Sequence, residues 1–252
     1  MPSNQDQPLS KVPQVTLLFW IVKIAATTLG ETGGDAVSMS MNLGYLAATA
    51  IFAAAFIVAV AAQIRSGRFH PLLYWATILA TTTVGTTLAD FADRSLGIGY
   101  AGGTSLLLSL LLLSMALWHR TLGTVSADSI RTPQAEMFYW ATIMFSQTLG
   151  TALGDWTADT AGLGYAGGAM VFGGLLAVIV ALYYRTAVSR TLLFWSAFVI
   201  TRPLGAVVGD FLDKPLSDGG LALSRYSASA ALLAFMLTCI LLFRQGAADR
   251  NH

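Results

Sequence analysis

Four aspartates recur at matching places along the chain and could together hold a cation. Each follows a tryptophan at the same spacing, with a glycine at a fixed position between them. Their carboxylates, with nearby hydroxyl, amide and backbone oxygens, form a ligand set that favours hard cations such as Mg²⁺ or Mn²⁺, or protons. Rings of acidic side chains also select cations in membrane channels. The four aspartates are Asp35, Asp90, Asp155 and Asp210.

The same short template surrounds each of these aspartates. It consists of a tryptophan, nine residues, a glycine, three residues, a small residue and the aspartate. The first copy is 20–35, and the other copies begin at Trp75, Trp140 and Trp195. Because the copies keep one register, we interpret the chain as four tandem units, which is typical of a quasi-symmetric architecture.

The composition is that of an integral membrane protein. The 252 residues are 55% hydrophobic and 11% charged, with a mean hydropathy of +0.65. A soluble domain is about 25% charged, and several apolar runs here reach the ~20 residues that cross a bilayer. The single cysteine, Cys239, excludes an internal disulfide and cannot build a thiolate metal site alone.

Each unit contains a helix with polar residues, a polar link and a helix without charge. We therefore expect an all-α membrane protein with eight transmembrane helices, arranged as four tandem helical hairpins in a parallel pseudo-symmetric repeat. One longer linker divides the chain into two halves. The expected boundaries are a polar, loosely ordered tail at 1–14, repeats at 15–70, 71–120, 136–190 and 191–245, a cytoplasmic linker at 121–135, and a tail at 246–252.

Basic residues predict the orientation of these helices. Nine of them fall on one side of the predicted membrane and three on the other, so we expect both termini in the cytoplasm. The four repeat tryptophans then lie near the cytoplasmic interface. The larger set is Lys11, Arg65, Arg68, Arg120, Arg131, Arg185, Arg190, Arg244 and Arg250, and the smaller set is Arg94, Lys214 and Arg225.

One face of each first helix is small and polar. Small residues four positions apart let membrane helices approach closely, and a charge that faces lipid costs at least about 2.5 kcal/mol. We therefore expect the four first helices to form an inner ring surrounded by the four charge-free helices. The stretch 30–34 favours a local helix break because it holds three glycines. The uncharged polar residues of this face include Thr27, Thr82, Thr86, Gln147 and Thr151.

Three further ionisable residues lie within predicted membrane helices, where such residues are functional candidates. We expect Glu31, with the four aspartates, to bind the ion or carry a proton, and Lys23 and Arg202 to act as counter-charges. Two other interpretations stay open: the three residues could form an ion-pair network that fixes packing, and the aspartates could cap helix ends. A second set of acids fits solvated loops better than an entrance to the site. This set is Asp93, Asp159 and Asp213.

The motif LGETGGD and its three degenerate copies resemble a family of bacterial inner-membrane proteins built from four tandem repeats of unknown function. The resemblance spans roughly residues 15–245, and the fourth copy diverges most, with Arg202-Pro203 and a longer link. The resemblance implies the repeat and a multi-pass topology, and it implies no substrate.

The predicted function is membrane transport, by a carrier or channel, of a small hard cation such as Mn²⁺ or Mg²⁺, with proton coupling as an option. The alternative is a scaffold or sensor subunit whose buried ion pairs serve assembly. We find no nucleotide loop, catalytic triad or HExxH motif, so we expect no enzyme and no cofactor other than a transported metal ion. The expected partners are the lipid bilayer and the cation, and we expect no binding of nucleic acid. Assembly into a homo-oligomer is left as an option.

Overall fold

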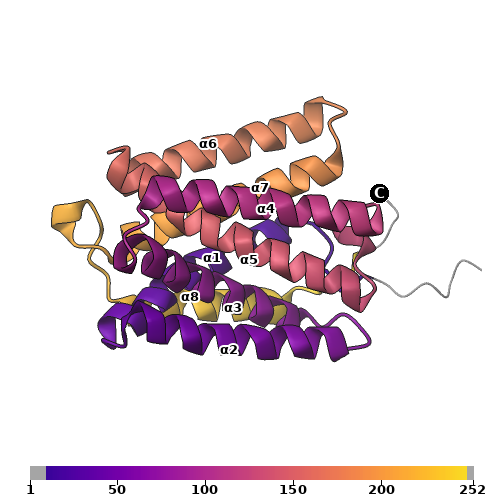
Figure 1. Cartoon of the computed structure of the whole chain (residues 1–252), viewed down its shortest axis with the longest axis horizontal. Helices are drawn as coiled ribbons and strands as arrows, with labels where there is room; N and C mark the ends of the chain where they lie inside the picture. The colour runs from indigo at the N-terminus through magenta and orange to yellow at the C-terminus, as the bar shows by residue number, and fades with distance from the viewer. Residues whose placement is uncertain (1–9, 249–252) are drawn as a thin grey trace, which may run out of the picture.

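The chain folds into eight α-helices, as a computed structural model that describes residues 10–248 shows (Figure 1). Arg250, one of the basic residues counted above, lies outside this range. Within it, the only strand-like pairing is an isolated antiparallel bridge between Pro13 and Ala247. The helices are α1 (Leu17–Asp35), α2 (Gly44–Arg65), α3 (Pro71–Asp90), α4 (Tyr100–Leu122), α5 (Pro133–Asp155), α6 (Gly164–Arg185), α7 (Arg190–Asp213) and α8 (Arg225–Leu242).

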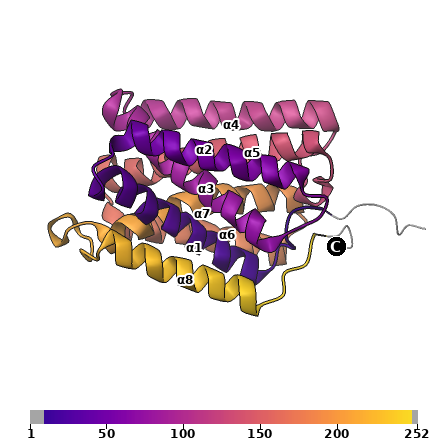
Figure 2. The same cartoon turned by 90° about the horizontal axis from the view of Figure 1, so that it is seen from below.

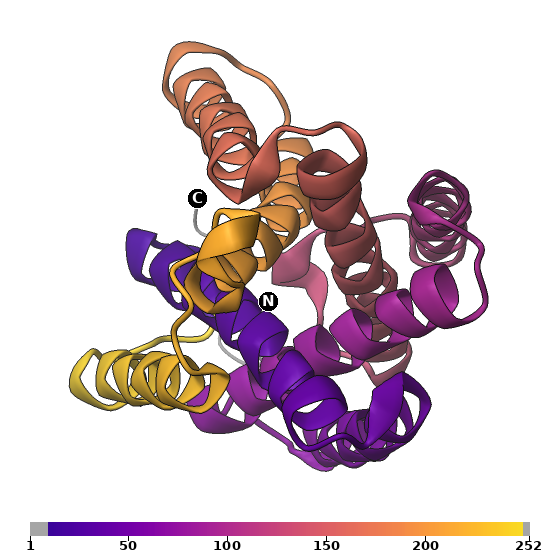
Figure 3. The same ribbon diagram turned by 90° about the vertical axis from the view of Figure 1, so that its left-hand side faces the viewer.

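The first helices of the four repeats form a closed ring. Helix α1 packs against α3, α3 against α5, α5 against α7, and α7 returns to α1. Most residues of these four helices are buried, whereas the second helices expose most of theirs. Figure 3, which looks roughly along the helices, shows α2, α4, α6 and α8 around the outside. The predicted inner ring and its outer layer are therefore confirmed.

The second helices do not form the predicted hairpins. Helix α2 packs along α3, α4 along α5, α6 along α7, and α8 along α1, so each covers the first helix of the following repeat (Figure 2). The two helices of one repeat do not pack along each other. The prediction was wrong because adjacency in sequence does not fix packing. In the first three repeats, a five-residue π-helical turn and a glycine with positive φ carry the chain to the neighbouring ring helix.

Glycines set the close spacing of the ring helices. A Cβ added to Gly85 would lie 3.0 Å from backbone atoms of Gln147 and Thr148 on the next helix. Helix α1 runs unbroken through residues 30–34, so the predicted break is wrong; Gly30 and Gly34 instead admit side chains of α3. The cyclic set of contacts is Gly30 with Thr82, Gly85 with Gln147, Gly150 with Arg202, and Gly205 with Thr27.

Six described helices, α2, α3, α4, α6, α7 and α8, are long and apolar enough to cross a membrane. Helices α1 and α5 fall short of this criterion, and α1 contains three charged residues. Both are surrounded by other helices, α1 by α3, α7 and α8, and α5 by α3, α4 and α7. The outer helices expose many large apolar side chains, which indicates a multi-pass membrane protein.

Three chain segments cover the tryptophan end of the ring. We call residues 10–14, 125–131 and 245–248 the terminal plug. Ser10 donates a hydrogen bond to the Ala127 carbonyl (2.9 Å), and the Ala248 amide donates to the Val12 carbonyl (2.8 Å). The expectation of a loose tail is therefore wrong for residues 10–13, which are buried.

The repeat tryptophans support this plug. Trp75, Trp140 and Trp195 are buried in an aromatic cluster and do not face lipid. The Trp195 indole donates to the Val125 carbonyl (2.8 Å), and the Trp75 indole donates to Gln245 Oε1 (2.7 Å). The expectation that these three side chains lie at a lipid interface is corrected accordingly.

Candidate cation site inside the ring

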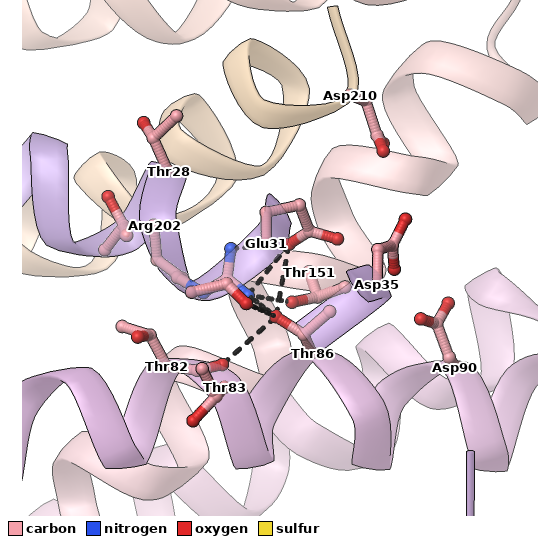
Figure 4. A network of polar contacts seen from close by, with 12 residues as sticks. Thr28, Glu31, Asp35, Thr82, Thr83, Thr86, Asp90, Thr151, Arg202 and Asp210 are labelled. Atoms are coloured by element: carbon pink, nitrogen blue, oxygen red, sulfur yellow. Dashed lines mark hydrogen bonds and ion pairs between the residues drawn. The ribbon is translucent and has the colours of Figure 1, made fainter. Parts of the chain in front are cut away.

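Arg202 lies at the centre of the ring and binds three other ring helices. Its Nη1 and Nη2 each donate to Glu31 Oε2 of α1 at 3.0 Å. Nη2 also donates to Thr86 Oγ1 of α3 (2.6 Å) and to Thr151 Oγ1 of α5 (Figure 4). The arginine and the glutamate are both buried, so the pair is screened little by solvent.

Arg202 fits at this place because the residue that faces it on α5 is a glycine. Gly150 of α5 lies directly against the Cβ and Cγ atoms of Arg202, and a side chain at position 150 would collide with them. The guanidinium can therefore reach the other three ring helices. Arg202 thus pairs with Glu31, as predicted for a counter-charge.

Lys23 has no such role. Its ammonium lies 4.1 Å from the centre of the Phe198 ring and 3.4 Å from Thr201 Oγ1. No carboxylate in residues 10–248 forms an ion pair with it, so the expected neutralisation of an acid by Lys23 is not found.

The four aspartates lie beyond Glu31, and two cations bridge them in pairs. Lys214 Nζ donates to Asp35 Oδ2 (2.9 Å) and lies 3.0 Å from Asp210 Oδ1. Burial alone would lower the pKa of Lys214, but Asp210 and Asp35 outweigh burial and raise this pKa above its usual range. The two aspartates therefore favour the charged form of Lys214.

The second bridge is made by Arg94. Its Nε lies 2.9 Å from Asp90 Oδ1, and its Nη2 lies 3.2 Å from Asp155 Oδ2. Like Lys214, Arg94 follows its own aspartate by four residues and reaches the aspartate of the next repeat. The aspartates are thus tied into two pairs rather than one evenly spaced ring.

Arg225 joins the network from α8. Its Nε donates to Asp213 Oδ2 at 2.8 Å, and its Nη2 lies 3.7 Å from Asp35 Oδ2. Asp213 is mostly buried, so the expectation of a solvated loop residue is wrong for this acid. Asp93 is also mostly buried, whereas Asp159 is exposed.

Two groups of carboxylates come close enough to share an ion. Oxygens of Glu31, Asp155 and Asp210 all lie within 4.8 Å of one another, and the same holds for Asp35, Asp210 and Asp213. Asp90 belongs to neither group and reaches Asp155 only through Arg94. The first group draws on three ring helices, α1, α5 and α7.

The buried network contains more acids than cations. Six carboxylates face four basic side chains, which leaves a net formal charge of −2 when all groups are ionised. The acids are Glu31, Asp35, Asp90, Asp155, Asp210 and Asp213, and the cations are Arg94, Arg202, Lys214 and Arg225.

The uncharged polar residues fall into three groups. Thr86 and Thr151 accept hydrogen bonds from Arg202. Thr27 and Thr82 instead donate to backbone carbonyls of their own and neighbouring helices, and so serve packing. Gln147 is fully buried, and neither atom of its amide has a hydrogen-bond partner within the described range.

Three important cations were not identified as site residues from the sequence. Arg94, Lys214 and Arg225 were counted only as basic residues on the less basic side of the membrane. A signal for two of them was present, since Arg94 and Lys214 each follow an aspartate by one helical turn. Arg225 had no local signal because Asp213 and Asp35 reach it from other parts of the chain.

Comparison with known proteins supports the repeat and adds no function. A family model described as Repeat of Unknown Function (DUF347) matches residues 18–69, 73–124, 138–189 and 193–246. No curated protein and no solved structure matches the chain. The tandem repeat inferred from the sequence is confirmed, because the four matches together cover most of the chain. The chain belongs to the family of the Repeat of Unknown Function (DUF347), of which it carries four copies.

Proposed function

We propose that this protein is a transporter of a small hard cation, with Glu31, Asp155 and Asp210 as its central ligands. All eight helices cross the bilayer in this proposal, and both termini face the cytoplasm of an inner membrane. The transported ion is divalent, such as Mn²⁺ or Mg²⁺, because carboxylate oxygens are the ligands such ions prefer.

The observation that carries this proposal is the convergence of three buried carboxylates from three ring helices. Two carboxylates within 4.8 Å repel each other by roughly 3–4 kcal/mol at an effective dielectric constant of about 20. Arg202 bonds to Glu31 alone among the three. A bound cation would offset the remaining repulsion, and the excess of two acids in the network matches the charge of one divalent ion.

Contacts at both ends of the ring favour a carrier over an open channel. Lys214 and Arg94 bridge the aspartates at one end, and the terminal plug covers the other. Arg202 fills the axis between them. A carrier would open one end at a time around this central region.

One observation favours the alternative of a structural scaffold: each of the four aspartates, like Glu31, already has a basic partner within 4 Å. Such a network can serve assembly alone. The two functions differ in their dependence on an added ion.

Thermal unfolding of the purified protein in detergent separates them. A transporter should be stabilised by its own ion, by about 2.7 kcal/mol at one hundred times the dissociation constant. We expect Mn²⁺ or Mg²⁺ to raise the melting temperature of the wild type, and Glu31→Gln and Asp155→Asn to abolish this response. Asp159→Asn, which changes an exposed acid outside both carboxylate groups, should keep it. Two results together would favour the scaffold: Glu31→Gln is less stable than the wild type, and the wild type does not respond to any metal ion.

A further inference from the structure

A second set of fully buried polar side chains lies on the ring helices, between the level of Arg202 and the aromatic cluster at the tryptophan end. Lys23 lies at the end of this region that is nearer to the aromatic cluster. This lysine is fully buried, and its described contacts are the Phe198 ring and one hydroxyl of Thr201. A buried ammonium ion without a counter-charge is costly. An anion beside Lys23 would supply the counter-charge that the described side chains do not.

Gln147 lies one helical turn further along the axis. Position 147 corresponds to Thr27, Thr82 and Arg202 in the other repeats, and each of these four residues packs against a ring glycine of the preceding repeat. The Gln147 side chain is fully buried, and both Oε1 and Nε2 lack hydrogen-bond partners in residues 10–248.

Arg202 contributes a second unsatisfied donor. Its two terminal nitrogens bind Glu31, Thr86 and Thr151, but its Nε is buried and has no acceptor among the described residues. Buried polar groups in proteins are nearly always hydrogen-bonded, to protein or to an ordered partner. Gln147 precedes Thr151, which Arg202 bonds, by one turn of α5, and Lys23 contacts the residue just before Arg202.

We propose that Lys23, Gln147 and Arg202 together form a binding site for a small monovalent anion such as chloride. An anion there would neutralise the ammonium group of Lys23 and accept hydrogen bonds from Gln147 Nε2 and Arg202 Nε. Positive charge and donors predominate in this region, which is the opposite of the carboxylate region beyond Glu31. The inference does not depend on cation transport, because none of Lys23, Gln147 and Arg202 is a proposed ligand of the cation.

The binding test is thermal unfolding in sodium chloride, bromide or gluconate at constant ionic strength. The wild type should melt about 2–4 °C higher in chloride or bromide than in gluconate, with a saturable dependence on halide concentration. Lys23→Met and Gln147→Met should remove the difference. Ile143→Leu is the matched control, because Ile143 occupies the position of Lys23 in the third repeat and should leave the halide response intact.

A second variant tests the charge argument even if Lys23→Met does not fold. Gln147→Glu would place a carboxylate where we infer the anion. This variant should be as stable in gluconate as the wild type is in chloride, and it should no longer respond to halide. A Gln147→Glu protein that keeps a full halide response would overturn the site.

Anomalous diffraction from crystals grown in bromide locates the ion directly. We expect one bromide peak within hydrogen-bond distance of Gln147 Nε2. A wild type without halide-dependent stability, bromide found only on the surface, or an ordered water at this place without bromide would each overturn the proposal.

Discussion

At the scale of single residues, the ring is held together by charged residues that differ between the repeats and pair with one another. Arg202, at a position that holds threonine or glutamine in the other copies, finds its acid, Glu31, at a position that holds threonine in two copies. Both were identifiable from the sequence, because charged residues within apolar helices stand out. Their partnership was identifiable only as one of several options, since it joins residues from opposite ends of the chain.

Removing one member of this pair should cost far more than removing both. Glu31→Gln leaves Arg202 buried without its carboxylate, and we expect a loss of about 3–5 kcal/mol in unfolding free energy. The double variant Glu31→Gln with Arg202→Gln should recover most of this loss. Denaturant unfolding in detergent measures both, with Asp159→Asn as a surface control expected to stay within about 0.5 kcal/mol of wild type. Costs that simply add in the double variant would contradict a direct pair.

At the scale of helices, periodicity predicted which helices are inside but not which helices touch. The small, polar face of each first helix correctly indicated the inner ring, because such a face cannot meet lipid. The sequence did not predict that each outer helix packs on the first helix of the following repeat. The apolar surface of α2, for example, could cover α1 as well as α3. The glycines of 30–34 were misinterpreted for a related reason: their effect depends on a neighbouring helix that the local sequence does not show.

A glycine pair on two helices tests this packing. In Gly85→Ala the new methyl group would lie 3.0 Å from the backbone of Gln147 and Thr148, and backbone cannot move aside cheaply. We expect a loss of about 1–3 kcal/mol in stability. Gly173→Ala, on outer helix α6 with no atom within 4 Å, should be neutral or slightly stabilising. Equal effects of the two substitutions on unfolding in detergent would argue against the close ring.

At the scale of the whole molecule, the four sequence repeats form one closed ring of helices. The ring closes because α7 meets α1 and α8 covers α1, so the first and last repeats are neighbours. Charge reduces this fourfold arrangement to a twofold one: Lys214 and Arg94 sit in alternate repeats and each joins two aspartates. The repeat and the ring followed from the sequence, whereas the alternation depends on contacts across repeat boundaries.

The carboxylates inside this ring of helices are the basis of the proposed transport. Uptake of Mn²⁺ into proteoliposomes, followed with a fluorescent indicator inside the vesicles, tests it most directly. We predict saturable uptake by the wild type, at least tenfold slower uptake by Asp155→Asn, and unchanged uptake by Asp159→Asn. Wild-type vesicles that take up Mn²⁺ and Mg²⁺ no faster than empty liposomes, or an Asp155→Asn protein as active as the wild type, would contradict it.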